Sequence, residues 1–222
     1  MNDFILKTYD NLTIQDKEFF FNFCRDASKE TEKSASVNMW ARNTFVKPWT
    51  LGYRLESTNE FKEPNGKFYI LYNNNEVIGC SGIHVSEFHP LIFSAGVRTW
   101  IKKEYRNQSI NKKYFFPEQR SWAIKKEAKI IFLSFNEYNK NLIQVFKRNR
   151  LGENKERVTN RNKNDLFSNG LKIIDFPLII NQTKQWICYE IIDEDFDYDW
   201  TRLAYSDDRK EQIYTKDLSK RF

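Results

Sequence analysis

Cysteine, glycine, proline and histidine are all scarce in this sequence. Its 222 residues include three cysteines, seven glycines, five prolines and two histidines. The cysteines, Cys24, Cys80 and Cys188, are far apart and none belongs to a Cys-x-x-Cys pair, so the sequence predicts neither a disulfide framework nor a zinc site. We expect each of the three to be a small buried apolar residue.

Long apolar runs and a targeting segment are also missing. Runs such as residues 91–97 stop well short of the roughly 20 residues that a membrane span needs, and the first four residues carry no basic-then-apolar secretion signal. We therefore expect a cytoplasmic protein without membrane association. Hydrophobic residues make up 40% of the chain, enough for one sizeable core. We predict one domain over residues 1–192 and a C-terminal extension over residues 193–222.

The excess of positive charge is moderate: 36 Lys and Arg face 30 Asp and Glu, a net charge of +6. Two windows hold much of it, Lys102–Lys113 with five bases against one acid and Lys147–Lys163 with seven against two. Such windows are typical of a solvated surface or of a polyanionic partner, so nucleic acid stays open as a partner. The acidic run Asp193–Asp199 lacks the spacing and central glycine of a calcium loop, which indicates a solvated or docking tail.

Hydrophobic spacing predicts a helix near the start of the chain. Residues 13–33 place apolar side chains at helical intervals, and Thr13 and Asp16 are candidate caps at its beginning. We expect this helix to lie on the core. Residues 40–53 are aromatic without a clear period, and we interpret them as irregular.

A meander of three strands is predicted next. The β-rich runs at residues 67–72 and 76–85 flank Asn73-Asn74-Asn75, which is typical of a hairpin turn because asparagine tolerates positive φ. Residues 91–101 follow a turn at residues 87–90 and add a third antiparallel strand.

The period then changes. Residues 110–128 predict a helix, residues 129–135 a short apolar strand and residues 140–147 a second helix. A strand, helix and strand without a hairpin turn imply a crossover and parallel pairing. Pro117 falls inside the first of these helices and removes a hydrogen bond, so we expect a kink there or a late helix start.

Residues 171–180 and 185–192 predict a closing hairpin. Together the elements predict an α/β fold of the α+β type. Its mixed, mostly antiparallel central sheet is flanked by helices.

The junction between the strand ending near Ile101 and the helix starting near Ile110 is the most suggestive point for chemistry. A helix N-terminus presents unpaired backbone N–H groups and the positive end of a dipole, so a polar loop flanked by bases can bind a phosphate or diphosphate there. An ordinary capped helix has the same pattern, and both interpretations stay open at this point.

The order of elements and this junction together resemble the GCN5-related N-acetyltransferase (GNAT) family. The resemblance covers residues 10–192 in element order and residues 98–150 in motif. In that family the fourth strand leads into an acyl-CoA loop of pattern R-x-x-G-x-G/A, and Ile101, Glu104-Tyr105 and Arg106 stand in the corresponding places. The family's asparagine after the fifth strand and tyrosine on the next helix fall on Asn139 and Phe146.

The resemblance implies acetyl-CoA or another acyl-CoA as cofactor. The residues implied to bind it are Trp100, Ile101, Arg106, Asn107, Gln108, Ser109, Ile110, Asn111, Asn139 and Phe146. Both loop glycines of the pattern are replaced, by Ser109 and Asn111, so the backbone approaches a diphosphate less closely unless these residues adopt unstrained conformations. Asn111 tolerates a left-handed geometry, and Ser109 has a hydroxyl to donate.

Acyl transfer to an amine requires a base and a group that polarises the thioester carbonyl. Candidate bases are His84, Glu87 and His89, which include the only two histidines of the chain. The backbone N–H groups around Trp100 and Ile101 are the candidate polarisers.

The resemblance also raises the question of which group protonates the departing thiolate. Phe146 has no proton to give where the family tyrosine has one, so this role passes to water, Tyr114 or Tyr138. Arg98 lies on the same strand face as Trp100, and it either binds an anionic acceptor group or pairs with a carboxylate.

The first functional hypothesis is an acyl-CoA-dependent N-acyltransferase that transfers an acetyl group to a primary amine by direct attack in a ternary complex. The acceptor is a small molecule or a macromolecule. One alternative is a catalytically degenerate GNAT-fold binding or structural protein. The other is a nucleic-acid-associated acyltransferase, for instance of phage origin. The sequence leaves the acyl group open, and also the choice between monomer and homodimer.

Overall fold

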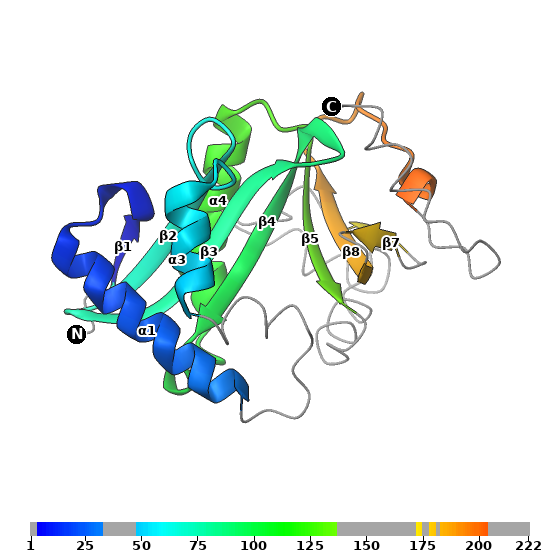
Figure 1. Cartoon of the computed structure of the whole chain (residues 1–222). Coiled ribbons are helices and arrows are strands. Elements are labelled where there is room, and N and C mark those ends of the chain that lie inside the picture. The colour runs from blue at the N-terminus through cyan, green and yellow to red at the C-terminus, as the bar shows by residue number, and fades with distance from the viewer. Residues whose placement is uncertain (1–3, 33–47, 137–171, 175–177, 181–182, 204–222) are drawn as a thin grey trace. The chain divides into compact units, whose positions relative to one another are not determined.

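The computed structural model describes residues 4–32, 48–136, 172–174, 178–180 and 183–203 (Figure 1). They form two compact units. The first unit holds the described residues up to Val85 together with Ala95–Gln119, and the second holds Ser86–Ser94 and the described residues from Arg120 onward. Strand β4 (His89–Ile101) contributes residues to both units.

The sheet of the first unit is antiparallel at its start. Strands β1 (Phe4–Thr8), β2 (Gly66–Asn73), β3 (Glu76–Ser86) and the second half of β4 follow one another in hydrogen-bonding order, and the β1–β2 and β2–β3 pairs are antiparallel. Asn74, in the turn between β2 and β3, has a φ of 55°, which asparagine tolerates. The predicted hairpin is confirmed, whereas β1 has no counterpart among the predicted elements.

Two helices cover one face of this sheet. Figure 1 shows α1 (Ile14–Glu32) and α3 (Pro48–Ser57) in front of β2 and β3. The core between them and the sheet is almost fully apolar and buries Phe20, Phe23, Leu51, Leu55, Phe68, Ile70 and Tyr72. The three residues from β2 alternate along the strand and therefore share the sheet face that packs against the two helices.

The start of α1 is fixed by a reciprocal pair of side-chain hydrogen bonds. The Asp16 backbone N–H donates to Thr13 Oγ1 at 3.1 Å, and the Thr13 backbone N–H donates to Asp16 Oδ2 at 3.1 Å. This is the capping-box arrangement. The predicted helix and its two capping residues are therefore confirmed.

Helix α3 corrects the interpretation of residues 40–53 as irregular, because Pro48–Ser57 is helical. Pro48 occupies the first position of this helix, where a missing N–H costs nothing and its fixed φ is already helical. Leu51 and Leu55 lie one turn apart and are both buried. These two local signals predict the helix, but the surrounding aromatic residues obscure them.

The helix after the junction starts where the sequence predicts. It begins at Ile110, passes through a π-helical turn at Asn111–Phe115 and continues as α4 (Phe116–Lys125). The Phe116 N–H donates to the Asn111 carbonyl, five residues back. A widened turn here accommodates Pro117, whose ring would clash with the carbonyl four residues back in a regular helix. The expected late start is therefore wrong.

The second unit confirms the predicted crossover. Residues Ile92–Ser94 of β4 pair in parallel with Ile130–Phe132 of β5 (Ile130–Asn136). Strand β5 pairs antiparallel with β8 (Thr183–Ile191), which also pairs with the short strands β6 (Lys172–Ile173) and β7 (Leu178–Ile180). The closing hairpin is present, with its first strand in two pieces.

The core of the second unit includes part of the acidic tail. Phe88, Ile130, Phe132 and Ile187 form a buried cluster with Trp200 and Leu203 from the 3-10 helix η5 (Trp200–Leu203). The tail therefore packs by its apolar side chains up to Leu203, and Asp193 forms an ion pair with Lys129. None of the described helices is long and apolar enough to cross a membrane.

Candidate functional site

Strand β4 carries a bulge in its second half. Gly96 has a φ of 67° and Arg98 a φ of 53°, two left-handed residues in a strand, of which only the glycine is free of steric cost. The Thr99 Oγ1 donates to the Gly96 carbonyl at 2.7 Å, across the bulge. Such bulges re-aim side chains and are frequent beside functional sites.

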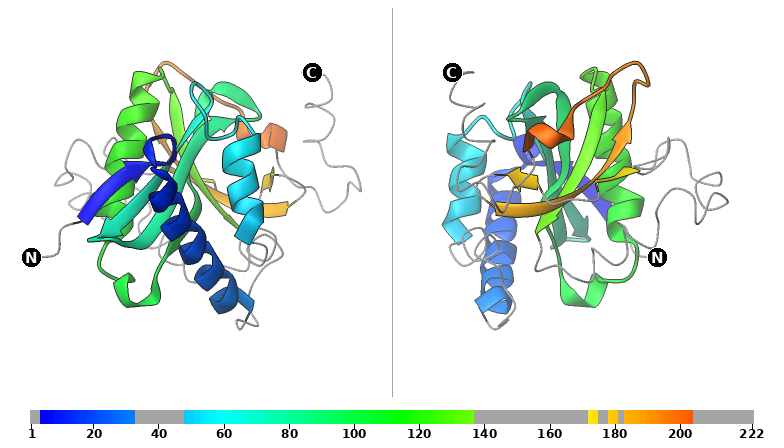
Figure 2. Two further views of the ribbon diagram at one scale, coloured as in Figure 1. Left: turned by 60° about the vertical axis from the view of Figure 1, so that its left-hand side comes forward. Right: turned by 90° about the vertical axis from the view of Figure 1, so that its right-hand side faces the viewer.

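A buried glutamine holds this bulge from the opposite face of the sheet. Gln119 is fully buried; its Oε1 accepts from the Gly96 N–H at 3.0 Å and its Nε2 donates to Ser81 Oγ at 2.8 Å. Ser81 Oγ in turn lies 2.7 Å from Thr99 Oγ1. Figure 2 shows that the helix bearing Gln119 covers the face of β2 and β3 opposite α1 and α3.

The loop after β4 has the geometry of an anion site. It includes a 3-10 turn at Lys103–Tyr105, and Asn107 and Ser109 have φ values of 65° and 58°. The first backbone bond of the helix runs from the Lys113 N–H to the Ser109 carbonyl at 2.9 Å. Among the described residues, no acceptor meets the backbone N–H groups of Ser109, Ile110 and Asn111. Three donors at a positive dipole end are thus available for an anion.

The replaced glycines behave differently from one another. Ser109, at the first glycine position, adopts the left-handed conformation that a glycine would supply. Asn111, at the second, lies inside the π-helical turn and is not left-handed, so the fold does not use the tolerance of asparagine for that conformation. The pattern keeps its backbone shape at the first position only.

The Arg106 side chain is hydrogen-bonded to other residues of the protein. Its Nε donates to the Ile101 carbonyl at 2.9 Å, and its two terminal nitrogens donate to both carboxylate oxygens of Glu30 in α1, at 2.7 and 3.1 Å. The guanidinium carbon lies 4.8 Å from the centre of the Trp100 ring, within cation–π range. Three N–H groups of the guanidinium are therefore used in hydrogen bonds within the protein.

A cavity of about 190 Å³ lies beside this arginine. Its apolar lining comes from Phe23, Ala27 and Trp100 and its charged lining from Asp26, Glu30, Lys102, Lys103 and Glu104. Lys102 forms an ion pair with Glu76 at 2.5 Å. Two of the five bases predicted as a basic window, Lys102 and Arg106, are thus paired with acidic residues of the protein, which weakens the case for nucleic acid.

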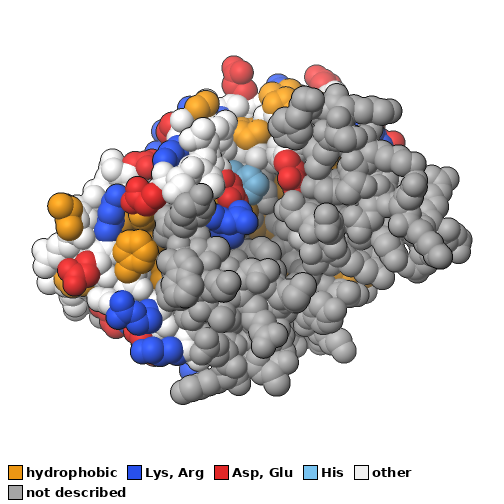
Figure 3. Space-filling view, viewed as in Figure 1, with side chains coloured by type: hydrophobic (Ala, Val, Ile, Leu, Met, Phe, Trp, Pro, Cys, Tyr) orange, Lys and Arg blue, Asp and Glu red, His pale blue; other side chains and the backbone are white. Residues whose placement is uncertain are grey.

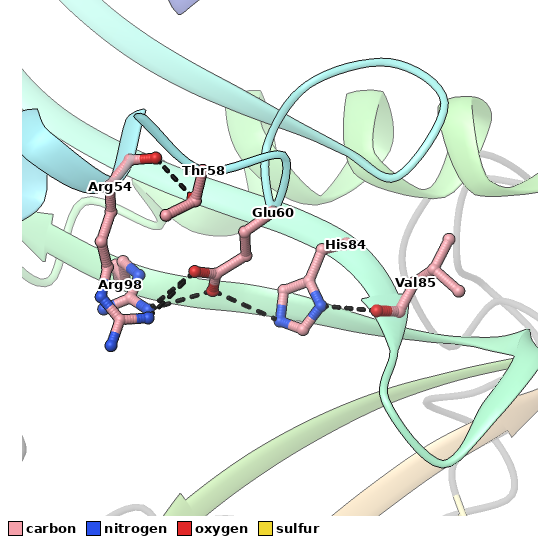
Figure 4. Close-up of polar contacts among 6 residues, drawn as sticks. All are labelled: Arg54, Thr58, Glu60, His84, Val85 and Arg98. Atoms are coloured by element: carbon pink, nitrogen blue, oxygen red, sulfur yellow. Dashed lines mark hydrogen bonds and ion pairs between the residues drawn. The ribbon is translucent and has the colours of Figure 1, made fainter. Parts of the chain in front are cut away.

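A second polar cluster lies on the same sheet face as α1 and α3. Figure 4 shows the carboxylate of Glu60 between the guanidinium of Arg98 and the ring of His84. Arg98 Nη2 donates to Glu60 at 3.0 and 3.2 Å, Arg54 donates at 3.0 Å, and His84 Nε2 lies 3.9 Å from Glu60 Oε1. Phe61 contacts both Arg98 and His84. On the face drawn in Figure 3, a histidine, an acidic and a basic side chain adjoin one another in this way.

The charges of this cluster are strongly coupled. Burial opposes the charged form of Glu60, but Arg98, His84 and Arg54 outweigh it and hold the pKa of Glu60 below its ordinary value of 4.5. For Arg98 the sequence left two interpretations open, binding of an anionic acceptor group or pairing with a carboxylate. The structure pairs Arg98 with the Glu60 carboxylate. Its side chain is only 7% exposed.

The two ring nitrogens of His84 have different neighbours. Its Nδ1 lies 2.7 Å from the Val85 carbonyl, and since a carbonyl can only accept, Nδ1 carries the proton. The other nitrogen, Nε2, faces Glu60. A proton taken up at Nε2 therefore completes an ion pair with that carboxylate.

The other two predicted bases belong to the second unit. His89 Nδ1 accepts from the Leu91 backbone N–H at 3.1 Å, and the ring packs against Phe196 and Tyr198. His89 thus has a structural task at the start of β4. Glu87 is exposed in the preceding turn.

The remaining predicted residues divide into two groups. Tyr138, Asn139 and Phe146 lie outside the described residues. Tyr114 packs against Phe4 at 5.2 Å between ring centres. The backbone N–H of Trp100, a predicted polariser, faces the Cys80 thiol instead, so it is directed into the sheet.

Three residues of the site escaped sequence reasoning: Glu30, Glu60 and Gln119. Each is separated from its partner by a long stretch of chain, 76 residues for Glu30 and Arg106 and 38 for Glu60 and Arg98. No local pattern marks them. Only the tertiary fold pairs them with the predicted residues.

Comparisons with known proteins place this geometry in a fold. No protein-family model and no curated protein sequence matches the chain. The PaiA N-acetyltransferase of Thermoplasma acidophilum, solved with coenzyme A, is similar with a TM-score of 0.54 and 16% identity, covering 85% of this chain and 99% of that one. A GNAT-family acetyltransferase of Staphylococcus aureus Mu50 gives 0.53 and 13%, covering 86% and 100%.

A ribosomal-protein-alanine N-acetyltransferase of Brucella melitensis is similar as well, with a TM-score of 0.52, 12% identity and coverages of 85% and 99%. These structures define the class: the chain has the fold of the GNAT N-acetyltransferases. The resemblance seen in the sequence and the predicted fold class are thereby confirmed. Identities this low establish a fold, and function is argued from the site.

Proposed function

We propose that this chain is an acyl-CoA-dependent N-acyltransferase. The observation that carries the proposal is the set of backbone N–H groups at Ser109, Ile110 and Asn111 that meet no acceptor within the described part of the chain, after the fourth strand of a GNAT fold. A diphosphate accepts hydrogen bonds from such a cradle and is favoured by the helix dipole. One structure of similar fold was solved with coenzyme A.

The replaced glycines do not prevent this use of the loop. Ser109 already holds the left-handed conformation, and no side chain caps the helix at Ile110. The strained serine costs about 1–2 kcal/mol. Such local strain is often kept where the backbone must face a ligand.

Acyl-CoA supplies an activated thioester, and the chain's own residues bind it and manage the proton of the amine. We assign the general base to His84, because its Nε2 lies 3.9 Å from Oε1 of the Glu60 carboxylate. The imidazolium formed by proton uptake is then stabilised by that carboxylate. The base removes a proton from the ammonium form of a primary amine, whose nitrogen would then form an amide bond with the acyl carbon as the C–S bond breaks. Coenzyme A would leave as a thiolate that takes its proton from water.

Cofactor binding tests the proposal most directly. Calorimetric titration with coenzyme A is expected to give saturable binding. The variant Ser109→Asp places a carboxylate where the phosphates would lie, and Asp is a good helix cap, so it should fold normally and lose binding. Ser109→Asn, which is neutral and also tolerates left-handed geometry, is the matched control and should keep it.

Two results would contradict the proposal. One is that the wild-type chain does not bind coenzyme A at millimolar concentration. The other is that Ser109→Asp binds as well as Ser109→Asn. Binding without turnover of any amine in a broad acceptor screen would instead support the catalytically degenerate alternative. The screen should contain both small primary amines and protein N-termini.

A further inference from the structure

The ion pair between Arg106 and Glu30 connects the phosphate loop to helix α1. Both terminal nitrogens of Arg106 engage Glu30, while its Nε closes the loop onto the Ile101 carbonyl. The guanidinium also stacks on Trp100. A guanidinium anchored on three sides fixes the conformation of the backbone that carries it.

From this geometry we infer that Arg106 is a positioning residue that holds the diphosphate loop in shape through Glu30 and does not itself bind the cofactor. The inference rests on the proposed function and assigns a role to Glu30, a residue of α1 outside the loop. Arg106 immediately precedes Asn107 and Ser109, the two left-handed residues. These residues turn the free N–H groups outward, so the arginine anchors the start of the strained segment.

The surroundings of the pair favour a mechanical role. Glu30 lines a cavity together with Ala27, Trp100 and Glu104, so the α1 side of the ion pair is not enclosed by packed side chains. Both partners are close to 40% exposed. Exposed pairs contribute little to global stability, and the fold therefore survives loss of the pair while the loop loses its anchor.

The sign of one substitution separates positioning from direct binding. If Arg106 positions the loop through Glu30, Glu30→Gln weakens coenzyme A binding on the order of 10-fold, comparable with the loss of one hydrogen bond to a charged group. If the guanidinium bound the diphosphate directly, Glu30→Gln would release it from a competing carboxylate and tighten binding. Asp26→Asn, in the same helix and lining the same cavity, is the control and should leave affinity unchanged.

A double-mutant cycle and a truncated substrate complete the test. Glu30→Gln combined with Arg106→Gln should bind coenzyme A no worse than Arg106→Gln alone, because both remove one link. The kcat/KM for acetyl-CoA should fall in Glu30→Gln, whereas that for S-acetylpantetheine, which has no diphosphate, should not. A general loss of structure would lower both.

The possible results are distinguishable from failure of the proposed function. If the wild-type chain does not bind coenzyme A, both ideas fall together. If the wild-type chain binds coenzyme A but Glu30→Gln binds it equally well or more tightly, only the positioning role is overturned. The same holds if the affinity losses of Glu30→Gln and Arg106→Gln add in the double variant. Thermal unfolding of each variant verifies that it is folded.

Discussion

Arg98 Nη2 donates to both carboxylate oxygens of Glu60, at 3.0 and 3.2 Å, and so joins a bulged residue of β4 to the segment after α3. Arg98 is buried, and the Glu60 side chain is 20% exposed. A buried guanidinium needs such a partner because its desolvation is otherwise uncompensated. The pair also holds the Glu60 carboxylate beside the His84 ring.

Glu60→Gln should destabilise the protein by about 3–5 kcal/mol at neutral pH, because Arg98 is left buried without its charge partner. The folded-state pKa of Glu60 is lowered. Its stabilisation is therefore complete above the ordinary value of 4.5 and is lost as the pH falls through the folded-state pKa. Urea unfolding at several pH values should show wild type and variant converging in acid.

The exposed pair of Glu76 with Lys102 provides the control for this prediction. Glu76→Gln should cost about 1 kcal/mol or less. Equal losses for the two substitutions would show that the Glu60 pair is not a buried one.

The pH dependence of turnover should identify His84 as the base. An asparagine can keep the Nδ1-type hydrogen bond of a histidine while deleting Nε2. His84→Asn should lower kcat/KM by roughly 10²–10⁴-fold and remove the acid limb of the profile. His89→Asn should retain the limb. Glu60→Gln should move it to lower pH, because the imidazolium loses its carboxylate; an unchanged limb in His84→Asn would exclude His84.

Gln119→Ala should remove the side-chain hydrogen bonds that hold the β4 bulge and so lower the stability of the protein. It removes Gln119 from the part-buried bond to the Gly96 N–H and from the buried bond to the Ser81 hydroxyl, and such losses cost about 1–3 kcal/mol each when a buried partner is left unpaired. Differential scanning calorimetry should show a lower Tm. Gln108→Ala removes only an exposed bond to the Glu104 carbonyl and should change Tm little, so similar shifts would contradict the role of Gln119.

Ser109→Gly should stabilise the chain by about 1–2 kcal/mol, since the φ of 58° costs a serine that much and a glycine nothing. Part of this gain is offset by the greater freedom of glycine in the unfolded state. Ser109→Ala loses the hydroxyl but keeps the strain and should not gain stability. Chemical denaturation of the three proteins checks this ranking, which a gain in Ser109→Ala would refute.

All three thiols should be unreactive in the folded protein. Cys24, Cys80 and Cys188 are buried, and burial raises the pKa of the Cys80 thiol to about 12, so thiolate is scarce at neutral pH. A thiol reagent should titrate no cysteine in buffer and three after denaturation. Fast reaction of one thiol in buffer would show that the unit around it opens.

Sequence reasoning succeeded where the signal is local. The helix at α1 follows from apolar spacing and the cap at Thr13, and the hairpin at Asn73–Asn75 follows from turn chemistry. The crossover follows from a change of period near Ile110. Sequence reasoning missed helix α3, because the aromatic residues around it mask the spacing of Leu51 and Leu55. It also missed β1, because this five-residue edge strand has no strong pattern.

The candidate site likewise combines features that local sequence signals predict with features that they do not. The sequence by itself determined the order of the elements and the position of the loop between Ile101 and Ile110, because turn, cap and period signals act between neighbouring residues. Only the tertiary structure decided that Arg106 meets Glu30, that Arg98 meets Glu60 and that Gln119 holds Gly96. Their partners come together through burial of apolar faces on a shared sheet, which no stretch of a few residues specifies.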